Sequence, residues 1–401
     1  MSDNDKKKIL ITTSTFPKWE MDTTPPFVYE LSKRLTDDLE IFILAPYSKG
    51  SKKYEIVDKM RIYRYKYWLN FKNNLADGAI LPNLKKNKLL WLQIPFFFLF
   101  QLLAIKKIIK KEKINTIHAH WIIPQGFVAV LYKKIINKNI KILCTSHGAD
   151  IFGLQKFNFL KKWILNNCTK LTVVSSAIKN EALKIGSQTN IDVVPMGVDL
   201  DIFNPKNYSE EIKNKYNISN IFLLFVGRLS EKKGIKYLIE AMPKIVEKFP
   251  KTKLLIIGNG EEKNKLENLT KKLNLNNNIT FVGAIHNSEL PKYYATANIF
   301  IGPSIISKDG DREGLPVTYM EAMASGCVLI GTNLDGNYDI LDHEKTGIMI
   351  KQHNSIEISK YVIELLNNKD YREKLIKNSI TKIENNYNWK IISKKYKELL
   401  K

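Results

Sequence analysis

Short apolar runs alternate with amphipathic helical patterns along the whole chain, and this alternation most restricts its possible folds. Lys8–Thr13 (KILITT) has the composition of a buried strand, Pro26–Leu35 (PFVYELSKRL) has the spacing of an amphipathic helix, and Glu40–Ala45 (EIFILA) is strand-like again. Further strand-like runs before residue 200 are Thr116–Ala119, Lys141–Thr145, Leu171–Ser175 and Asp192–Pro195. Strands separated by helices predict a parallel sheet with helices on both faces, and such sheets bind ligands at the carboxyl ends of their strands.

The same alternation begins again after the polar stretch Asp199–Asn207, which lacks periodicity and is typical of a linker. The strand-like runs of this second half are Phe222–Val226, Leu254–Ile257, Ile279–Val282, Ile299–Ile301 and Val328–Ile330. We therefore predict two doubly wound α/β domains, at residues 1–200 and 208–385, and a C-terminal segment at 386–401. Because Trp389–Lys401 has helical spacing, we expect it to form a helix that packs back near the N-terminal domain.

The composition excludes several classes of protein. Of the 401 residues, 44% are hydrophobic and 26% are charged, which argues against a disordered, collagen-like or polytopic membrane protein. The three cysteines (Cys144, Cys168 and Cys327) form no C-x-x-C pair, which argues against a disulfide scaffold or a thiolate zinc site. Because Met1–Lys8 is polar and leads directly into an apolar strand, we expect no secretory signal and a cytoplasmic location.

The charge is strongly basic and unevenly distributed. The chain has 63 Lys and Arg against 40 Asp and Glu, a formal net charge of +23. Residues 1–200 hold 32 basic and 16 acidic side chains, and residues 61–111 hold 11 basic side chains and one acid, Asp77. This skew predicts a polyanion or an anionic membrane surface as partner, such as the inner face of the plasma membrane. Coding bias is the alternative, since only six of the basic residues are Arg while Asn and Ile are abundant.

The segment Leu89–Ile109 (LLWLQIPFFFLFQLLAIKKII) has about the length of a membrane span, which needs about 20 apolar residues. Four features argue against a span: Gln93, Pro95, Gln101 and the pair Lys106-Lys107. Two other structures remain open. One is a long core helix packed on the sheet before the Thr116 strand, and the other is an interfacial helix that inserts Trp91 and the run Phe96–Phe98 into a bilayer beside the basic residues.

The densest group of candidate functional residues is Asp309–Gly326 (DGDREGLPVTYMEAMASG). Pro316 occupies the expected first position of a helix, Val317–Ser325, whose free N–H groups provide an anion site. Glu313 in the preceding loop and Glu321 on the helix, eight residues apart, flank that site. A phosphate could bind the amides while the two carboxylates accept hydrogen bonds from sugar or ribose hydroxyls.

A second group lies in the run Gly227–Gly234 (GRLSEKKG), directly after the first strand of the second half. Arg228 offers a bidentate guanidinium and Lys233 offers a point charge, five residues apart across a turn into a helix. We expect both to lie at the carboxyl edge of the sheet, beside the anion site, where they would neutralise a diphosphate.

Two patterns resemble metal sites without supplying a full set of ligands. Asp309-Gly310-Asp311 spells D-x-D, but the sequence identifies no convergent ligands around it. His118 and His120 alternate along a strand and therefore share one face, but one strand supplies no third ligand. We therefore expect no metal, and His120 either lines the ligand cleft or is structural.

Six motifs, in order along nearly the whole chain, resemble those of the retaining family 4 glycosyltransferases. The run EGLPVTYMEAMASG resembles their E-x7-E signature, and the others are TFPKWEMDTTPPFVYELSKRL, CTSHGADIF, VVPMGVD, FVGRLSEKKGIKYLIEA and IIGNGEEKNKL. The resemblance implies the GT-B fold, in which two Rossmann-like doubly wound domains face each other across a cleft. It also implies a glycosyltransferase of the hexosyltransferase type. The first domain would bind the acceptor and the second a nucleotide-sugar donor, a UDP- or GDP-sugar, with no cofactor required.

The resemblance assigns roles to individual residues. Arg228 and Lys233 would neutralise the leaving diphosphate. Glu313 would hold hydroxyls of the donor sugar, and Glu321 those of the ribose. His147 would touch the donor sugar near the reaction centre. The other implied positions are Gly227, Gly258, Gly260, Gly314, Leu315 and Pro316 on the donor side, and His120 and Asp150 on the acceptor side. The leaving diphosphate would accept the proton of the acceptor, so the reaction needs no carboxylate nucleophile.

The acceptor stays open at this point. The charge skew and Leu89–Ile109 favour a growing lipid-linked saccharide in the synthesis of a cell-surface polysaccharide or glycan, and a small soluble acceptor is the alternative. A nucleotide-sugar 2-epimerase on the same fold would need acid–base carboxylates and no acceptor. A nucleic-acid-binding module would need basic residues interleaved with exposed aromatics. Because Tyr63–Trp68 (YRYKYW) fits an amphipathic strand better, we expect no nucleic-acid partner.

Overall fold

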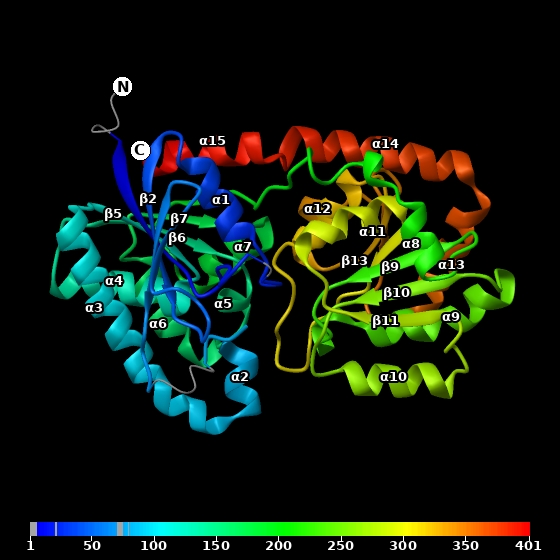
Figure 1. Cartoon of the computed structure of the whole chain (residues 1–401), viewed down its shortest axis with the longest axis horizontal. Coiled ribbons are helices and arrows are strands. Elements are labelled where there is room, and N and C mark those ends of the chain that lie inside the picture. The colour runs from blue at the N-terminus through cyan, green and yellow to red at the C-terminus, as the bar shows by residue number, and fades with distance from the viewer. Residues whose placement is uncertain (1–5, 21, 70–74, 79) are drawn as a thin grey trace. The chain divides into compact units, whose positions relative to one another are not determined.

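The chain divides into two units, each built around one β-sheet (Figure 1). Unit 1 comprises Met1–Met196 and Ile392–Lys401, and unit 2 comprises Gly197–Ile391. The computed structural model describes residues 6–20, 22–69, 75–78 and 80–401. The division falls just before Asp199–Asn207, the polar stretch that the sequence indicates as a linker.

Unit 1 contains a sheet of eight strands in the order β3-β4-β2-β1-β5-β6-β7-β8. The strands are β1 (Lys7–Thr12), β2 (Leu39–Pro46), β3 (Tyr54–Val57), β4 (Met60–Tyr65), β5 (Thr116–His120), β6 (Lys141–Ser146), β7 (Lys170–Val173) and β8 (Ile191–Val193). Neighbours are parallel, as predicted, except β3 and β4, which form an antiparallel hairpin at one edge. The hairpin turns at Asp58 and Lys59, both at positive φ, and this pair lacks the Asn-Gly signal by which such turns are recognised in sequence.

The central strands of unit 1 are covered on both faces, which explains their continuous apolar runs. Ile9, Leu10 and Ile11 of β1 have no exposed surface. The helical segments of unit 1 are α1 (Phe27–Leu35), α2 (Ile80–Lys86), η2 (Lys88–Gln93), α3 (Ile94–Glu112), η3 (Ile122–Gly126), α4 (Phe127–Ile135), α5 (Ala149–Phe152), η4 (Gln155–Phe157), α6 (Asn158–Leu165) and α7 (Ser176–Ile185).

Unit 2 contains a fully parallel sheet of six strands in the order β11-β10-β9-β12-β13-β14. The strands are β9 (Phe222–Val226), β10 (Lys253–Ile257), β11 (Ile279–Gly283), β12 (Ile299–Gly302), β13 (Val328–Thr332) and β14 (Ile348–Ile350). Counted along the unit, this order is 3-2-1-4-5-6, which is the order of dinucleotide-binding sheets. The order reverses between β9 and β12, and open α/β sheets bind ligands at that point.

The helices of unit 2 fall into two sets, as expected when both faces of a sheet are covered. α9 packs beside α10 and α13, whereas α12 packs beside α11 and α14. The helical segments are η5 (Pro205–Asn207), α8 (Glu210–Lys215), η6 (Glu231–Lys233), α9 (Ile235–Lys248), α10 (Lys263–Lys272), η7 (Asn287–Glu289), α11 (Leu290–Thr296), α12 (Val317–Ala324), η8 (Asp335–Asp339), α13 (Ser355–Asn367) and α14 (Lys369–Asn386).

Helix α9 illustrates how the sequence pattern produces this packing. Ile235, Leu238, Ile239, Met242 and Ile245 recur at helical spacing and are all buried. They belong to the apolar core that also contains the central strands of the sheet. Burial of each such side chain contributes about 1.5–3 kcal/mol, so this face stabilises α9 far more than its intrinsic helix propensity does.

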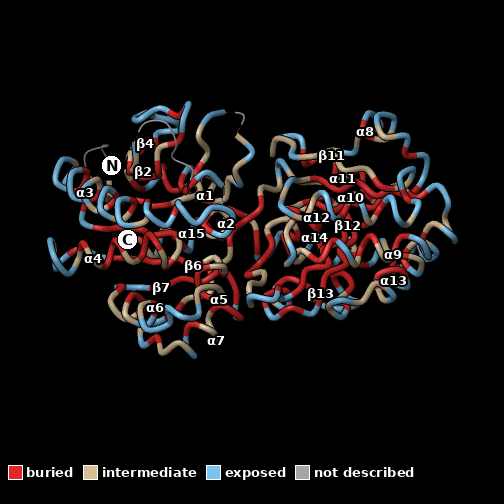
Figure 2. The backbone as a smooth tube through the Cα atoms, turned by 90° about the horizontal axis from the view of Figure 1, so that it is seen from below, coloured by how far each residue is buried: buried red, intermediate tan, exposed pale blue. Residues whose placement is uncertain are grey.

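Helix α3 is only half a core helix. Phe97, Gln101 and Ile105 on one side are buried, whereas Leu99 and Leu103 on the other side are about half exposed. Figure 2 accordingly shows the tube of α3 in a mixture of the colours of buried and exposed residues. The segment Lys88–Glu112 has the length and apolar composition of a membrane span. Only 28% of its most apolar part is buried, whereas a core helix would be mostly buried. The core-helix interpretation of this segment therefore holds for one face alone.

The last helix, α15 (Trp389–Leu400), contributes all but its first three residues to unit 1. Ile392, Tyr396 and Leu400 are buried, and the hydroxyl of Tyr396 donates to the carbonyl oxygen of Val194 at 3.2 Å. The C-terminal residues thus complete the core beside the last strand of the eight-stranded sheet.

Candidate functional site

The candidate site of unit 2 lies at the carboxyl edge of its sheet, where the strand order reverses. β9 pairs with β10 on one side and with β12 on the other, so the loops that follow β9 and β12 lie side by side. The N–H of Ile305 donates to the carbonyl oxygen of Lys232 at 2.7 Å and joins these two loops. The loops that carry the predicted residues are therefore fixed to each other at the ligand-binding edge of the fold.

Two lysines from the loop after β9 converge on one glutamate from the loop before α12. Nζ of Lys233 lies 3.2 Å from Oε2 of Glu313. Nζ of Lys232 lies 3.5 Å from Oε1 of Glu313 and 3.2 Å from Oδ2 of Asp311. The side chains of Lys233 and Glu313 are only 15% and 11% exposed. Lys233 and Glu313, which were predicted as separate site residues, are therefore in direct contact, and Lys232 is a partner that was not predicted.

The electrostatics of this cluster keep Glu313 ionised. Burial alone would raise the pKa of Glu313, but the ammonium groups of Lys233 and Lys232 outweigh it and lower that pKa to about 2. Burial acts to lower the pKa of Lys232, yet the carboxylates of Glu313 and Asp311 outweigh burial and raise it. Burial raises the pKa of Asp311 despite its pairing with Lys232, so Glu313 is the dominant carboxylate partner. At neutral pH the cluster offers ionised lysines and an ionised carboxylate to a ligand.

Helix α12 starts directly after this glutamate. Its first residue is Val317, as predicted, but Pro316 has the extended backbone of an N-cap and does not occupy the first helical position expected for it. Its N-cap makes no side-chain hydrogen bond to the first turn. The buried residues Gly314 and Leu315 lead into the helix, so the amides of its first turn are aimed at the same edge of the sheet.

Glu321, the second predicted carboxylate, lies one turn further along α12 and is in a different environment. Its Oε2 accepts a hydrogen bond from the hydroxyl of Tyr294 at 2.8 Å, and Tyr294 has no exposed surface. Burial raises the pKa of Glu321 to about 7, and the hydrogen bond from Tyr294 opposes that shift only in part. Glu313 and Glu321 therefore differ in charge near neutral pH, although the sequence predicts the same hydrogen-bond-accepting role for both.

Two glycines allow backbone segments of the site to approach each other. A Cβ on Gly258, whose φ is +135°, would lie 1.9 Å from the carbonyl oxygen of Gly227. A Cβ on Gly336 would lie 2.0 Å from the carbonyl oxygen of Gly314. Gly336 was not predicted as a site residue. Gly260, which was predicted, lies against the backbone of Leu229.

Arg228 is the most exposed of the predicted cations in this site. Its Nη2 and Nε lie 3.2 Å and 3.3 Å from Oε2 of Glu261, which the sequence did not single out. The side chains are 40% and 53% exposed. Because an exposed ion pair contributes little free energy, an incoming anion can replace Glu261 at the guanidinium.

In unit 1, His118 and His120 point to the same side of β5, as predicted, and their ring centroids lie 4.2 Å apart. Nδ1 of His120 lies 3.0 Å from Nε2 of His147, and Nε2 of His118 lies 2.8 Å from the hydroxyl of Thr145. Burial lowers the pKa of His118 and of His147 to about 3, and it lowers the pKa of His120 as well. All three imidazoles are therefore neutral at physiological pH and form a network at the carboxyl ends of β5 and β6.

Asp150, the other residue predicted on the acceptor side, holds the loop around His147. Its Oδ2 accepts from the N–H of Ile122 at 2.6 Å, and its Oδ1 accepts from the hydroxyl of Ser146 at 2.8 Å and the N–H of Gly148 at 3.2 Å. Burial raises the pKa of this carboxyl, while the hydrogen bonds from the loop oppose the shift. Its described contacts fix the backbone that presents His147.

Neither suggested metal pattern gathers a set of ligands in the described part of the chain. No group of three or more His, Cys, Asp or Glu side chains suited to a metal occurs there. Asp309 accepts from the hydroxyl of Ser307 at 2.6 Å, and Asp311 pairs with Lys232.

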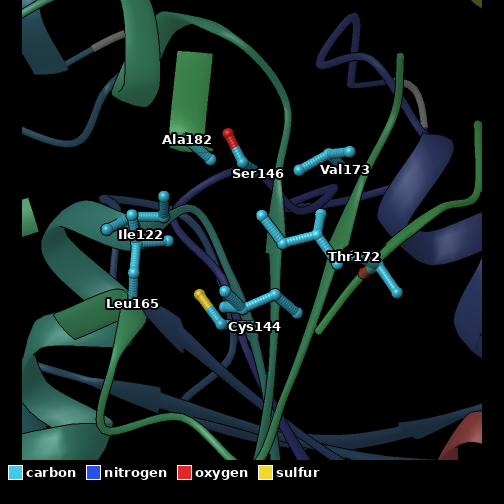
Figure 3. A pocket seen from close by; sticks show the side chains of 9 residues that line it. Ile122, Cys144, Ser146, Leu165, Thr172, Val173 and Ala182 are labelled. Carbon is cyan, nitrogen blue, oxygen red and sulfur yellow. The ribbon is translucent and has the colours of Figure 1, made fainter. Parts of the chain in front are cut away.

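A small pocket in unit 1 is a gap in the core and not a ligand site. It is lined by Ile122, Cys144, Ser146, Leu165, Leu171, Thr172, Val173, Ala182 and Ile191 (Figure 3). It leaves essentially no room for a water molecule, and its lining is almost entirely apolar.

Comparison with known proteins gives two adjacent family matches. Residues 26–202 match the model for Glycosyltransferase Family 4, and residues 209–382 match the model for Glycosyl transferases group 1. Two uncharacterized glycosyltransferases of Methanocaldococcus jannaschii are each 30% identical to the chain. The matches cover 62% and 68% of this chain, and 63% and 71% of those proteins.

A GDP-mannose-dependent phosphatidylinositol monomannoside mannosyltransferase of Mycobacterium tuberculosis is 28% identical over 57% of this chain and 61% of its own length. Among solved structures, a sucrose-phosphate synthase from Thermosynechococcus elongatus superposes with a TM-score of 0.82 at 20% identity. The alignment covers 98% of both chains. The Anabaena protein HepE, in complex with UDP-glucose, superposes with a TM-score of 0.75 at 14% identity over 98% of this chain and 99% of its own. The fold is therefore GT-B, and the chain belongs to the family 4, or group 1, glycosyltransferases.

Proposed function

We propose that the protein is a retaining glycosyltransferase that moves a hexose from a UDP- or GDP-sugar to a saccharide or lipid-linked saccharide acceptor. The observation that carries this proposal is the convergence of Lys233, Lys232 and Glu313 at the switch point of the unit 2 sheet, beside the start of α12. Lysines, helix amides and an ionised carboxylate together match a ligand that carries both phosphates and hydroxyls.

The donor diphosphate would bind the cationic side of this cluster. Lys233 and the amides at the start of α12 would neutralise the charge that develops as the sugar–phosphate bond breaks. Arg228 would exchange its exposed partner Glu261 for a phosphate oxygen, with two N–H groups available for a bidentate contact. Two similar proteins support a nucleotide-sugar donor: the mycobacterial mannosyltransferase is GDP-mannose-dependent, and the structure of HepE is a complex with UDP-glucose.

Glu313 and Glu321 would accept hydrogen bonds from hydroxyls of the donor. Glu313 stays ionised and can accept hydrogen bonds from the sugar, while both of its oxygens remain near a lysine. A carboxylate held in this way is a poor nucleophile, which favours retention without a glycosyl–enzyme intermediate. Glu321, near the other end of the donor, would accept from the ribose hydroxyls.

In unit 1, His147 near the donor sugar and His120 on the acceptor side would contribute neutral imidazoles, and Asp150 would fix the loop that carries His147. A neutral imidazole can donate one hydrogen bond and accept another, which suits a hydroxyl-rich acceptor or donor sugar. We place the reaction in the cytoplasm, because the three cysteines are free and buried, as in a reducing compartment.

A calorimetric titration of the purified protein with UDP, GDP and ADP tests the donor proposal. We expect one nucleoside diphosphate to bind, and Lys233→Ala to weaken that binding about a hundredfold. Lys236→Ala is the matched control, since Lys236 is an exposed lysine that pairs with Glu240 nearby. Equal binding by both variants and the wild type would reject the proposed diphosphate site.

Retention is tested separately from binding. Once the binding nucleotide is known, the corresponding nucleotide-sugar is incubated with saccharide acceptors, and the anomeric configuration of the product is read by NMR. A product with the configuration of the donor supports the proposal, whereas an inverted product would overturn the retaining mechanism.

A further inference from the structure

Unit 1 carries an exposed strip of large apolar side chains along η2 and the outer face of α3. The members of this strip, called the apolar strip below, are exposed by 41% to 73%: Leu89, Trp91, Leu92, Phe96, Leu99, Phe100 and Leu103. Single exposed apolar residues are common on soluble proteins, but a contiguous row of seven is not. The apolar strip is therefore expected to be a surface that binds another molecule or a membrane.

The helical spacing places the α3 members on one face. Phe96, Leu99, Phe100 and Leu103 follow the i, i+3, i+4, i+7 pattern. The opposite face, which includes Phe97, is buried in unit 1. Because that face is committed to the core, α3 cannot cross a bilayer without losing its packing, and the apolar strip can only lie along a surface.

Lysines stand at both ends of the apolar strip. Lys85, Lys86 and Lys88 precede it, and Lys106, Lys107 and Lys110 continue the same outer face of α3 after Leu103. All six lysines are exposed, and the sequence from 80 to 111 contains no Asp or Glu. An apolar centre between two basic ends matches an anionic lipid surface, with acyl chains below and phosphate groups on either side.

We propose that unit 1 docks on an anionic lipid bilayer through the apolar strip, with α3 parallel to the membrane plane. The apolar side chains enter the boundary between headgroups and acyl chains, and Trp91 sits at the headgroup level where its N–H stays hydrated. The six lysines contact lipid phosphates. A second copy of the chain is a poor occupant, because two such surfaces would bring their like-charged lysines together. The proposal does not depend on the donor site, so either can fail alone.

Flotation of the full chain with vesicles tests this proposal. The vesicles contain phosphatidylcholine alone or with about one-third phosphatidylglycerol, since anionic lipid is the proposed ligand. We expect flotation with the anionic vesicles and little with the neutral ones. We also expect flotation to fall in roughly 0.5 M salt, because salt screens the lysine contacts.

Two triple variants separate the apolar and the basic contributions. Leu92→Gln, Leu99→Gln and Leu103→Gln together remove exposed leucines, and Lys106→Gln, Lys107→Gln and Lys110→Gln together remove charge. Gln keeps the helix propensity at each position. We expect each triple variant to bind anionic vesicles about tenfold more weakly than the wild type.

Matched controls on unit 2 keep the test specific. Ile202→Gln with Ile356→Gln removes two exposed apolar side chains, and Lys248→Gln, Lys271→Gln and Lys272→Gln removes three exposed lysines. Both controls should float like the wild type, and all variants should keep its melting temperature. The proposal is overturned if the wild type does not float. It is also overturned if the strip variants float as well as the controls. If the wild type does not float but forms a dimer without lipid, and the leucine variant is a monomer, the apolar strip is an interface with a second copy of the chain instead.

Discussion

Nζ of Lys233 and Oε2 of Glu313 lie 3.2 Å apart, and this contact joins the loop after β9 to the loop before α12. Without a ligand, the carboxylate compensates the charge that the lysine would offer to a phosphate. With a diphosphate bound, Lys233 can contact both anions, because an ammonium group has three donors. The same pair therefore keeps the empty site stable and ties the phosphate site to the carboxylate proposed to bind the sugar.

Lys233→Ala should abolish most transfer activity, whereas Lys233→Arg should keep part of it. Loss of the ammonium removes charge stabilisation from the leaving diphosphate, and kcat/KM should fall by about a hundredfold or more. The arginine variant retains the charge but not the point geometry, so an intermediate value is expected. Steady-state kinetics with the donor identified by titration provide the measurement. An alanine variant with wild-type kcat/KM would remove Lys233 from the site.

Glu321 should make donor binding depend on pH near neutrality. In the folded protein the pKa of Glu321 is about 7, above its ordinary value of 4.5, so between these two pH values the folded chain binds more protons than the unfolded chain. The contribution of this group to the free energy of unfolding is therefore fully retained below pH 4.5 and is lost as pH rises toward 7. Ribose hydroxyls donate better to an ionised carboxylate, so donor binding should strengthen as pH rises through about 7.

The variant Glu321→Gln tests this linkage, since Gln preserves an oxygen that can accept from Tyr294. We expect the variant to melt at a higher temperature than the wild type at pH 8, and to bind the donor more weakly with little dependence on pH between 6 and 8. Glu289→Gln, on an exposed ion pair with Lys292, serves as the control and should follow the wild type. Parallel pH profiles for Glu321→Gln and the wild type would contradict the assigned role.

Gly336→Ala should impair donor binding with no change in any charge. The added Cβ would lie 2.0 Å from the carbonyl oxygen of Gly314 and must displace the loop that leads into α12. We expect donor affinity to fall by about tenfold, since a small displacement of positioning groups has a large effect. Tyr338→Ala changes an exposed residue in the same segment and should bind the donor normally. Titration of both variants decides the question, and equal affinities would show that the loop tolerates the displacement.

The sequence predicts the fold well because its information is local and repeated. Every strand-like run between Lys8 and Ile330 that the sequence analysis names corresponds to a strand, with ends shifted by a few residues at most. The hairpin of β3 and β4 was not predicted, because its turn residues, Asp58 and Lys59, adopt positive φ without a Gly or Asn. Local turn chemistry thus limits the prediction even where periodicity is clear.

The site is predicted less completely, because its geometry depends on contacts between distant segments. Motif spacing indicates Lys233, Glu313 and Glu321, but it cannot show that Lys232 shares Glu313 or that Tyr294 donates to Glu321. These partners and the burial of both groups explain why Glu313 is ionised while Glu321 has a pKa of about 7. Burial and pairing are properties of the folded chain, so the electrostatic character of the site follows only from the structure.

Tyr396→Ala should destabilise unit 1 selectively, because the ring of Tyr396 is completely buried and lies 5.5 Å from the ring of His118. Removing a buried aromatic side chain costs about 3–5 kcal/mol, whereas Tyr396→Phe keeps the ring and removes the hydroxyl that donates to Val194, a loss of about 1 kcal/mol. Hydrogen exchange should therefore accelerate strongly in β5 and β7 of the alanine variant and slightly in the phenylalanine variant. Exchange in β9 and β10 should stay at the wild-type rate. Equal acceleration in both units would mean that α15 stabilises the whole chain as one cooperative body, and unchanged exchange in β5 would show that the C-terminal turn contributes little to the core of unit 1.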